Sequence, residues 1–327
     1  MNAQLEIVDA GIAAVTDLGR RGQAFLGVQT NGAADQYSAR TANILVGNDE
    51  RAPLIEIFNV MPFAFRSSCS LLIAVTGAAE SVLVDGEPAE TGQPLFVWPG
   101  AVVKLPPAST GLRTYIGIRG RIEGDEFLGS VATDSLIGRG RRLSTGDVVH
   151  VDNGAVRVPS NVPFFRFGAP QQQYSHEWVL DVVPGVDADE FPTFVDELPA
   201  STFTVGNQSD HVGVRLEGPH FERSVTTEIV SRGVPLGAIE APPTGSLIIL
   251  MRGRPLTAGY PIPAVVARSC HHLLGQLRPG DSVRLKSVSV AESIAQTRRD
   301  EARLSRLRRR CATAFTACWP FESVSRP

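Results

Sequence analysis

Two polar segments near the N-terminus could bind an anion. They are 17–20, Asp-Leu-Gly-Arg, and 31–35, Asn-Gly-Ala-Ala-Asp, in which small residues surround the charged and amide side chains. A loop of this type at the start of a helix can hold a carboxylate or an oxyanion with its backbone N–H groups. A capped turn braced by an Asp17–Arg20 pair is the structural alternative, and the sequence leaves both open.

A second candidate anion site is the segment 138–142, Gly-Arg-Gly-Arg-Arg. Glycine lets the backbone curl and expose its N–H groups, and each arginine adds a planar fork of donors. An ordinary basic turn has the same composition, so anion binding and turn formation remain alternatives.

The second half of the chain adds two more segments. Residues 209–218 lead from a polar turn, Ser-Asp-His, into a predicted strand, and Tyr260 stands between Gly259 and Pro261 at a predicted turn. A tyrosine held in this way can donate a proton during catalysis, or it can simply anchor the turn.

Two other clusters of ionisable residues are better explained as structure. His271 and His272 are adjacent, so their side chains point apart on a helix or a strand, and no acidic residue stands at ligand spacing. The acidic run 187–190 fits the first turn of a short helix that buries Phe191 and Phe194.

The composition argues against several classes of protein. The net charge of −3 and the 7% aromatic content disfavour a nucleic-acid partner. Lysine occurs only at Lys104 and Lys286, and no Walker-type phosphate loop is present, which disfavours Schiff-base and P-loop chemistry. The four cysteines lack the spacing of a disulfide framework or a zinc site, so we predict no metal ligated by this chain. Without an apolar signal core or a membrane-length apolar run, a soluble, cytoplasmic protein with no membrane partner is predicted.

Short apolar segments bounded by Gly, Pro and Asp predict a mainly β fold. The segments 71–75, 81–84, 95–98 and 101–105 have the length and the branched content of strands. Several such strands with no long helix between them favour a barrel or a sandwich.

Two helices are predicted. The first covers about 34–46, because Asn31 and Asp35 are start signals and a Gly-Asn pair follows its end. The second covers about 291–310 and is rich in arginine. We interpret it as a solvated terminal helix, with docking to an acidic partner or a membrane surface as the alternative.

An internal echo indicates two similar β-modules. The segments 143–151 and 277–285 both read Leu-x-x-Gly-Asp-x-Val followed by alternation, the pattern of a turn that feeds a half-buried strand. The predicted organisation is a first β-barrel domain at 1–152, a linker at 153–176, a second β-barrel domain at 177–293 and an arginine-rich C-terminal tail at 294–327.

Taken in order, these motifs resemble the biotin-dependent carboxyltransferase family, which is also known as allophanate hydrolase subunit 2 or as the C subunit of 5-oxoprolinase. The resemblance spans about residues 11–292 and is specific as a collinear set, although each piece is short. The matching segments are 16–20, 27–28, 32–35, 42–48, 76–78, 128–130, 138–143, 146–147, 213–218, 231–239, 257–261 and 276–281.

The resemblance implies tandem cyclophilin-like β-barrel domains, with a few short helices and the C-terminal helix. It also implies a subunit of an ATP-dependent 5-oxoprolinase-type amidohydrolase, or of a biotin-dependent carboxyltransferase complex, that acts on a small cyclic or planar amide. ATP would be used at the level of the complex, and a partner could carry carboxybiotin. The expected partners are a kinase-inhibitor-like protein resembling the B subunit of 5-oxoprolinase and, in an oxoprolinase, the lactam-opening A subunit.

Within this hypothesis, the candidate site residues fall into three groups. Arginines would clamp charge, and an acid and a tyrosine would transfer protons. The candidate catalytic residues are Asp210 and Tyr260, the candidate substrate-binding residues are Arg20, Asn31, Asp35 and Arg215, and the candidate anion- or phosphate-binding residues are Arg119, Ser130 and Arg141.

Several hallmark positions depart from the family pattern. The usual Asp-x-Gln-Thr-Thr-Gly-Gly-Tyr-Pro is Gly-Arg-Pro-Leu-Thr-Ala-Gly-Tyr-Pro at 253–261, and the usual Ser-Asp-Arg-Met-Gly is Ser-Asp-His-Val-Gly at 209–213. The usual Gly-Gly is Gly-Arg at 120–121, and the usual Ile-Gln-Val-Pro is Ile-Glu-Ala-Pro at 239–242. These changes favour either a different substrate or a member without catalysis. The rival hypothesis is therefore a non-catalytic binding module that antagonises a kinase-inhibitor-like partner subunit.

Overall fold

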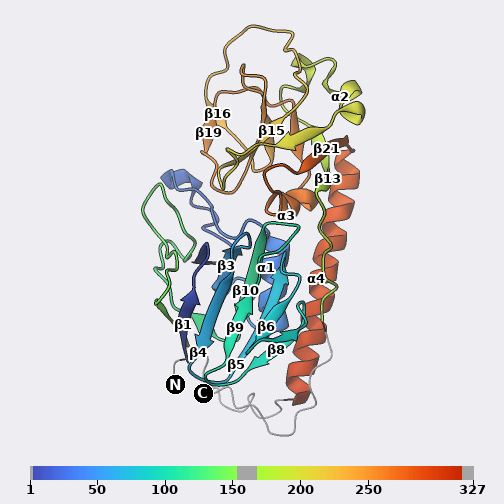
Figure 1. Ribbon diagram of the computed structural model, residues 1–327. Helices are drawn as coiled ribbons and strands as arrows, with labels where there is room; N and C mark the ends of the chain where they lie inside the picture. The colour runs from blue at the N-terminus through green and yellow to red at the C-terminus, as the bar shows by residue number, and fades with distance from the viewer. Residues whose placement is uncertain (1–2, 153–167, 319–327) are drawn as a thin grey trace. The chain divides into compact units, whose positions relative to one another are not determined.

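The computed structural model describes residues 3–152 and 168–318, and these fall into two compact units (Figure 1). The first unit comprises Met1–Leu18, Gln36–Gln173 and Glu301–Pro327, and the second comprises Gly19–Asp35 and Tyr174–Asp300. Most of the predicted linker at 153–176 and the end of the predicted tail lie outside the described residues. The segment with Arg20, Asn31 and Asp35 thus belongs to the same unit as Asp210 and Tyr260.

Two β-sheets build the first unit. One sheet has the strand order β11-β12-β1-β4-β9-β6-β7, and the other has the order β2-β3-β10-β5-β8. The strands are β1 (Ala3–Asp9), β2 (Ala13–Thr16), β3 (Leu54–Phe58), β4 (Phe63–Ser67), β5 (Leu71–Gly77), β6 (Val82–Val84), β7 (Glu87–Ala89), β8 (Pro94–Val97), β9 (Val102–Leu105), β10 (Arg113–Ile118), β11 (Arg121–Ile122) and β12 (Val148–Asp152).

One face of each sheet contributes to a shared core in the first unit. Strand β1 shows the alternation clearly, because Ala3, Leu5 and Ile7 are buried while Gln4 and Glu6 are exposed. The core combines residues of β1, β4, β9 and β12 from one sheet with residues of β2, β3, β5 and β10 from the other. The two sheets therefore pack face to face around a single hydrophobic interior.

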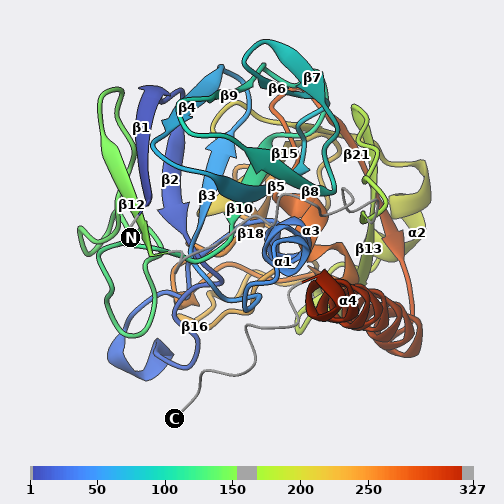
Figure 2. The same ribbon diagram turned by 90° about the horizontal axis from the view of Figure 1, so that it is seen from below.

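Helix α1 (Gln36–Leu45) packs on β5 and β10 in the first unit, as Figure 2 shows with α1 seen end-on. Gly117 of β10 permits the close approach, because a Cβ there would lie 2.7 Å from the carbonyl oxygen of Ala42. The predicted helix over about 34–46 is confirmed, and its residues Ile44 and Leu45 are buried.

The second predicted helix is confirmed as α4 (Val290–Cys318), but its interpretation as a solvated helix is wrong. From Glu301 onward, α4 belongs to the first unit and lies beside α1 (Figure 2). Its buried residues Leu304, Leu307, Cys311 and Phe315 pack in one cluster with the end of α1. They recur at helical spacing among the arginines, so this face is apolar although the helix as a whole is basic.

Ion pairs hold one flank of this helix in the first unit. The Arg40 guanidinium lies 2.7 Å from Glu301 and 3.2 Å from Glu50, and Arg308 lies 2.6 Å from Glu50. These charges alternate in sign, so each one has a neighbour of opposite sign.

The second unit is a closed barrel with the strand order β13-β20-β17-β18-β15-β14-β21. Strands β13 and β21 pair in parallel, with Trp178 opposite Val283. A separate two-stranded sheet joins β16 to β19. The strands are β13 (Glu177–Pro184), β14 (Phe203–Val205), β15 (Gly213–Glu217), β16 (Arg232–Gly233), β17 (Ala238–Glu240), β18 (Leu247–Leu250), β19 (Thr257–Ala258), β20 (Ala264–Val266) and β21 (Ser282–Ser287).

Short helical turns complete the second unit. Residues 188–190 of the acidic run form the turn η2, and Phe191 and Phe194 after it are buried, as predicted. These short elements are η1 (Ala24–Leu26), η2 (Ala188–Glu190), α2 (Phe194–Glu197), η3 (Leu198–Ala200), η4 (Arg268–Cys270) and α3 (His271–Leu274). Within the described residues, no helix is both long and apolar enough to cross a membrane.

The internal echo corresponds to the same local structure in the two units. In each copy, a turn closed by the aspartate leads into a strand, β12 in the first unit and β21 in the second. Asp147 accepts a hydrogen bond from the Ser144 N–H at 3.0 Å, and Asp281 accepts one from the Arg278 N–H at 2.8 Å. The predicted mainly β fold with short helices and a C-terminal helix is confirmed.

Candidate functional site

The segment 19–35 forms one hydrogen-bonded cluster with two turns of the second unit. The Asn31 N–H donates to the Arg252 carbonyl at 3.2 Å, and the Gly253 N–H donates to the His211 carbonyl at 2.9 Å. The Met251 N–H donates to the Val212 carbonyl at 2.8 Å. We call residues 19–35, 209–213 and 251–254 the loop cluster. It joins the polar N-terminal segment to the two turns that depart from the family pattern.

The conformation of this segment depends on residues that tolerate a left-handed backbone. Asn31 has a φ of 48°, which asparagine tolerates better than most residues. Gly19 has a φ of 84°, and a Cβ there would lie 2.3 Å from the Thr30 carbonyl oxygen. The Arg20 N–H donates to that same carbonyl at 2.7 Å, so the segment folds back on itself.

Arg20 and Asp35 are buried within the second unit. Arg20 is 1% exposed and Asp35 is 0% exposed. The Asp35 carboxylate accepts a hydrogen bond from the Gln276 side-chain amide at 2.8 Å and one from the Tyr174 hydroxyl at 3.4 Å. These contacts tie the end of the segment to the barrel, so Asp35 acts in the described structure as an anchor of the loop cluster.

Asp210 organises its own turn. Its Oδ1 accepts hydrogen bonds from the backbone N–H groups of Val212 at 2.7 Å and Gly213 at 3.1 Å, while the residue itself is exposed. Arg215 follows in β15, where its N–H donates to the Ser209 hydroxyl at 3.0 Å. The sequence predicted that these residues would lie in one turn and its following strand, and the loop cluster contains that turn.

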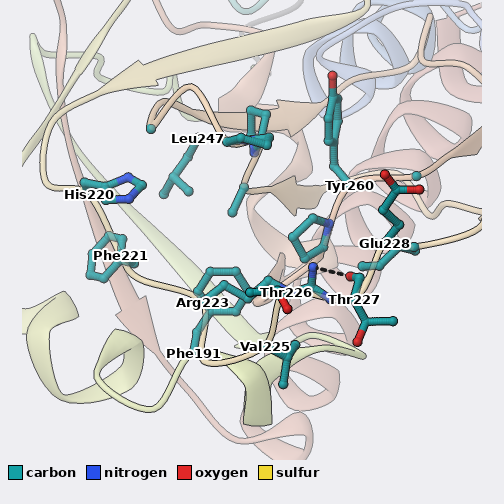
Figure 3. Close-up of a pocket in the computed structure, with 17 residues that line it drawn as sticks. Phe191, His220, Phe221, Arg223, Val225, Thr226, Thr227, Glu228, Leu247 and Tyr260 are labelled. Carbon is teal, nitrogen blue, oxygen red and sulfur yellow. Dashed lines mark hydrogen bonds between the residues drawn. The ribbon is translucent and has the colours of Figure 1, made fainter.

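Tyr260 lies elsewhere in the second unit and lines a pocket of about 560 Å³. The segments 220–229, 241–247 and 259–261 form its walls together with Phe191. Figure 3 shows Tyr260 and Glu228 on one side of the hollow and His220 and Phe221 on the opposite side. Of the two candidate catalytic residues, only Tyr260 lines this pocket, where it is 44% exposed. We call this hollow the Tyr260 pocket.

The three candidate anion-binding residues lie in the first unit and contact different neighbours. Arg119 donates to the Val46 carbonyl at 3.3 Å, and its guanidinium lies 4.8 Å from the ring centroid of Phe315. The Ser130 hydroxyl donates to the Asp17 carboxylate at 2.6 Å. The geometry of Arg119 indicates a structural contribution, because it ties the end of α1 to α4.

The basic segment 138–142 is neutralised in part by nearby carboxylates. Arg141 lies 3.6 Å from Asp147 and donates to the Val148 carbonyl at 3.0 Å. Arg139 lies 3.6 Å from Asp125 and stacks over Phe127 at 5.0 Å. Of the two alternatives that the sequence left open, these contacts favour the basic turn.

Sequence reasoning missed one buried carboxylate, Glu240 of β17. It is 4% exposed, burial raises the pKa of its carboxyl group, and within the described residues its Oε1 has no hydrogen-bond partner. The next residue, Ala241, lines the Tyr260 pocket and donates its N–H to the Pro261 carbonyl at 3.0 Å. The replacement of the family's usual glutamine at this position was the signal that could have identified it.

We expect Glu240→Gln to raise the free energy of unfolding at pH 7 by about 1–2 kcal/mol, because it removes a charge from a buried site. Because the pKa of Glu240 is raised in the folded chain, the unfolded chain releases this proton at a lower pH than the folded chain does. Above the unfolded pKa, the free energy of unfolding therefore falls as the pH rises. Below the unfolded pKa of about 4.3 both states are protonated, and the advantage of the amide should disappear. Urea unfolding at pH 7 and pH 4 measures this difference, and equal advantages at both values would contradict it.

Neither histidines nor cysteines form a metal centre in the described part of the chain. No group of three His, Cys, Asp or Glu residues there is arranged to hold a metal ion. The Nε2 of His271 instead faces the Val266 carbonyl at 3.1 Å.

Comparison with known proteins identifies similar chains. A family model described as the carboxyltransferase domain, subdomain A and B, matches residues 26–287. The C subunit of the Haemophilus influenzae 5-oxoprolinase is 29% identical over 306 residues, which cover 91% of this chain and 95% of that protein. The urea amidolyase of Saccharomyces cerevisiae is 32% identical over 299 residues, which cover 84% of this chain and 16% of that protein.

The fold of a solved structure agrees with these matches. The crystal structure of the K. lactis urea amidolyase aligns with a TM-score of 0.85 at 26% identity, over 93% of this chain and 20% of that one. Helix α4 begins at Val290 and so lies beyond the residues that the family model matches.

Proposed function

The chain belongs to the family of carboxyltransferase domains, subdomains A and B, and from that premise we propose that it is a subunit of an ATP-dependent, 5-oxoprolinase-type complex. The complex would open a small cyclic or planar amide. The observation that carries the proposal is the match over 95% of the length of a 5-oxoprolinase C subunit, against 16% of a urea amidolyase. The match includes nearly all of a protein that is named as a subunit, which supports a role alongside partner chains.

The expected partners are a kinase-inhibitor-like protein resembling the B subunit of 5-oxoprolinase, and the lactam-opening A subunit. ATP would be consumed by the assembled complex. A urea-type carboxyltransferase, in which a partner carries carboxybiotin, is the variant of this proposal that the urea amidolyase matches support.

The residues of the second unit suit parts of this chemistry. Opening an amide places negative charge on its oxygen and requires a proton on the leaving nitrogen. In this proposal Tyr260, which lines its pocket together with Gly259 and Pro261, would give that proton. Arg20, Asn31 and Arg215, in or next to the loop cluster, are the proposed substrate-binding donors, but they are not among the residues that line the Tyr260 pocket.

The size of the Tyr260 pocket also bears on the proposal. A volume of about 560 Å³ lies in the range of pockets that hold drug-sized ligands. A single small amide would leave much of it empty. The remaining space could take a reactive group that a partner subunit delivers.

The test is ATP hydrolysis by the chain co-purified with its two proposed partners, with 5-oxoproline, urea or no added substrate. Stimulation by 5-oxoproline alone is the expected result, and stimulation by urea alone would move the proposal to the carboxyltransferase variant. If neither compound stimulates hydrolysis by the intact complex, the proposal is wrong.

The site assignment has its own test within that complex. Tyr260→Phe and Asp210→Asn should each lower stimulated turnover at least tenfold, as expected for the loss of a proton-transfer group. Arg66→Gln, a change to an exposed ion pair in the first unit, is the control and should keep the wild-type rate. Wild-type turnover in both site variants would refute the assignment while leaving the proposed reaction intact.

A second candidate function is the non-catalytic binding module. It is favoured by the altered turn at 253–258 and by the engagement of Asp210 with its own backbone turn. A tight complex with the kinase-inhibitor-like partner, without substrate-stimulated turnover, would support it.

A further inference from the structure

A long segment without regular structure forms one wall of the Tyr260 pocket. Residues 218–231 run between β15 and β16 with no helix or strand among them. The segment 220–229 within this stretch supplies eight of the residues that line the pocket, including Val225 and Glu228 (Figure 3). Ordered segments of this length without secondary structure are often lids over binding sites.

The segment is anchored at both ends. At the start, Phe221 is buried, and its ring centroid lies 4.7 Å from that of Phe194 in the barrel core. At the end, the Ile229 carbonyl packs against Gly259, where a Cβ would lie 3.0 Å from the oxygen. The part between these anchors is exposed, with Val225 38% exposed.

One residue of the barrel holds the middle of the segment. The Glu190 carboxylate lies 2.6 Å from the Arg223 Nε, and the Glu190 carbonyl accepts hydrogen bonds from the N–H and the hydroxyl of Ser224 at 2.8 and 3.1 Å. Arg223 also donates to the Thr227 carbonyl at 2.7 Å, which Figure 3 shows as a dashed line. Arg223 therefore makes one hydrogen bond within the segment and one ion pair that joins the segment to the turn η2.

We propose that residues 222–229 are a lid on the Tyr260 pocket, and that the Arg223–Glu190 ion pair is the positioning element that sets which ligands can enter. Both side chains are partly buried, at 20% and 30% exposed, so the pair is screened less than a fully exposed one. Apolar side chains such as Phe191, Val225 and Leu247 line the pocket beneath. The lid therefore admits ligands that place an apolar body inside, and the closed pair excludes bulkier ones.

This proposal concerns the pocket alone and does not depend on the amide-opening reaction. Its first test is hydrogen exchange of the free chain, followed by mass spectrometry. In Glu190→Gln and Arg223→Gln, amides of residues 224–229 should exchange about fivefold faster, the scale expected for losing one partly exposed ion pair. Exchange in β15 and β18 should stay at the wild-type rate.

A matched control distinguishes a local effect of the Arg223–Glu190 ion pair from a general effect of losing any ion pair. Glu6→Gln breaks the Arg66–Glu6 pair of the first unit, whose atoms lie 2.9 Å apart, and should leave residues 224–229 unchanged. Unchanged exchange of these residues in both lid variants would overturn the proposal. An equal increase throughout the barrel strands would overturn it as well, because the pair would then be a general stabiliser.

A second test measures access to the pocket. Ala241→Cys places a thiol on the pocket wall, and the chain without this change gives the background from its own cysteines. Glu190→Gln should speed labelling of this thiol by a bulky maleimide about fivefold, with little effect on small iodoacetamide. The same acceleration for both reagents would show that the pair does not select by size.

Discussion

Asp281→Asn should lower the free energy of unfolding by about 2–4 kcal/mol, because an NH2 group replaces one acceptor oxygen of a buried carboxylate that takes three hydrogen bonds. Asp281 is 1% exposed. Its carboxylate faces the Nδ1 of His176 at 2.7 Å and accepts from the Trp178 indole N–H and the Arg278 N–H, both at 2.8 Å. The NH2 group of an asparagine here would face one of these three nitrogen groups, and a hydrogen bond to the carboxylate would be lost. Urea unfolding followed by far-ultraviolet circular dichroism measures the loss.

The internal echo supplies the matched control for this prediction. Asp147 holds the same position in the first copy of the motif, but its side chain is 32% exposed and accepts from the Ser144 N–H. Asp147→Asn should therefore cost about 1 kcal/mol or less. Equal losses in the two variants would show that burial does not set the cost, and no loss in Asp281→Asn would show that the network carries little stability.

The contrast between these aspartates illustrates what the sequence could predict about the fold. The repeated Leu-x-x-Gly-Asp-x-Val pattern and the alternation behind it predicted a turn and a strand in both halves, and both are present. Turn chemistry and the two-residue period are local properties, so a single sequence carries them. Which copy buries its aspartate depends on Trp178 and His176, about a hundred residues away, and no local pattern contains that information.

The same limit explains which features of the fold the sequence did not reveal. Segment 19–35 belongs to the second unit through contacts such as Asn31 with Arg252 and Asp35 with Gln276, each more than 200 residues apart in sequence. The interpretation of α4 as a solvated helix was wrong because it relied on the helix's many arginines and not on the positions of its few apolar residues. The positions of Leu304, Leu307 and Cys311 nevertheless place them on one helical face.

The candidate site was predicted in parts rather than as a whole. The sequence singled out the turn with Asp210 and the turn with Tyr260, and both lie in the second unit. It gave no indication that Tyr260 would line a pocket with the segment 220–229, which has no catalytic motif. A pocket wall made of irregular backbone has no period, so only the folded structure reveals it.

His271, one of the two adjacent histidines that the sequence analysis interprets as structural, has a shifted pKa. Burial is the largest cause that lowers the pKa of His271 to about 4, and the positive charges of the nearby Arg252 and Arg268 contribute to this shift. Its Nε2 lies 3.1 Å from the Val266 carbonyl, and a Cβ on Gly237 would lie 2.8 Å from that nitrogen. The imidazole is therefore partly buried and neutral at pH 7, with an N–H directed at a carbonyl oxygen.

The lowered pKa of His271 predicts that acid destabilises the second unit. In the unfolded chain the imidazole takes up a proton near pH 6.5, but in the folded chain it does so only near pH 4. Between these values the unfolded state binds the proton first, so stability falls as the pH falls, by a total of about 3 kcal/mol. His271→Gln keeps a donor for the carbonyl but does not titrate, and it should remove this part of the loss. The control is His220→Gln, which changes an exposed histidine of the same unit. In urea unfolding between pH 7 and pH 4.5, the free energy of unfolding should fall less steeply for His271→Gln than for the control. Equal slopes for the two variants would refute a His271 that stays neutral in the folded chain.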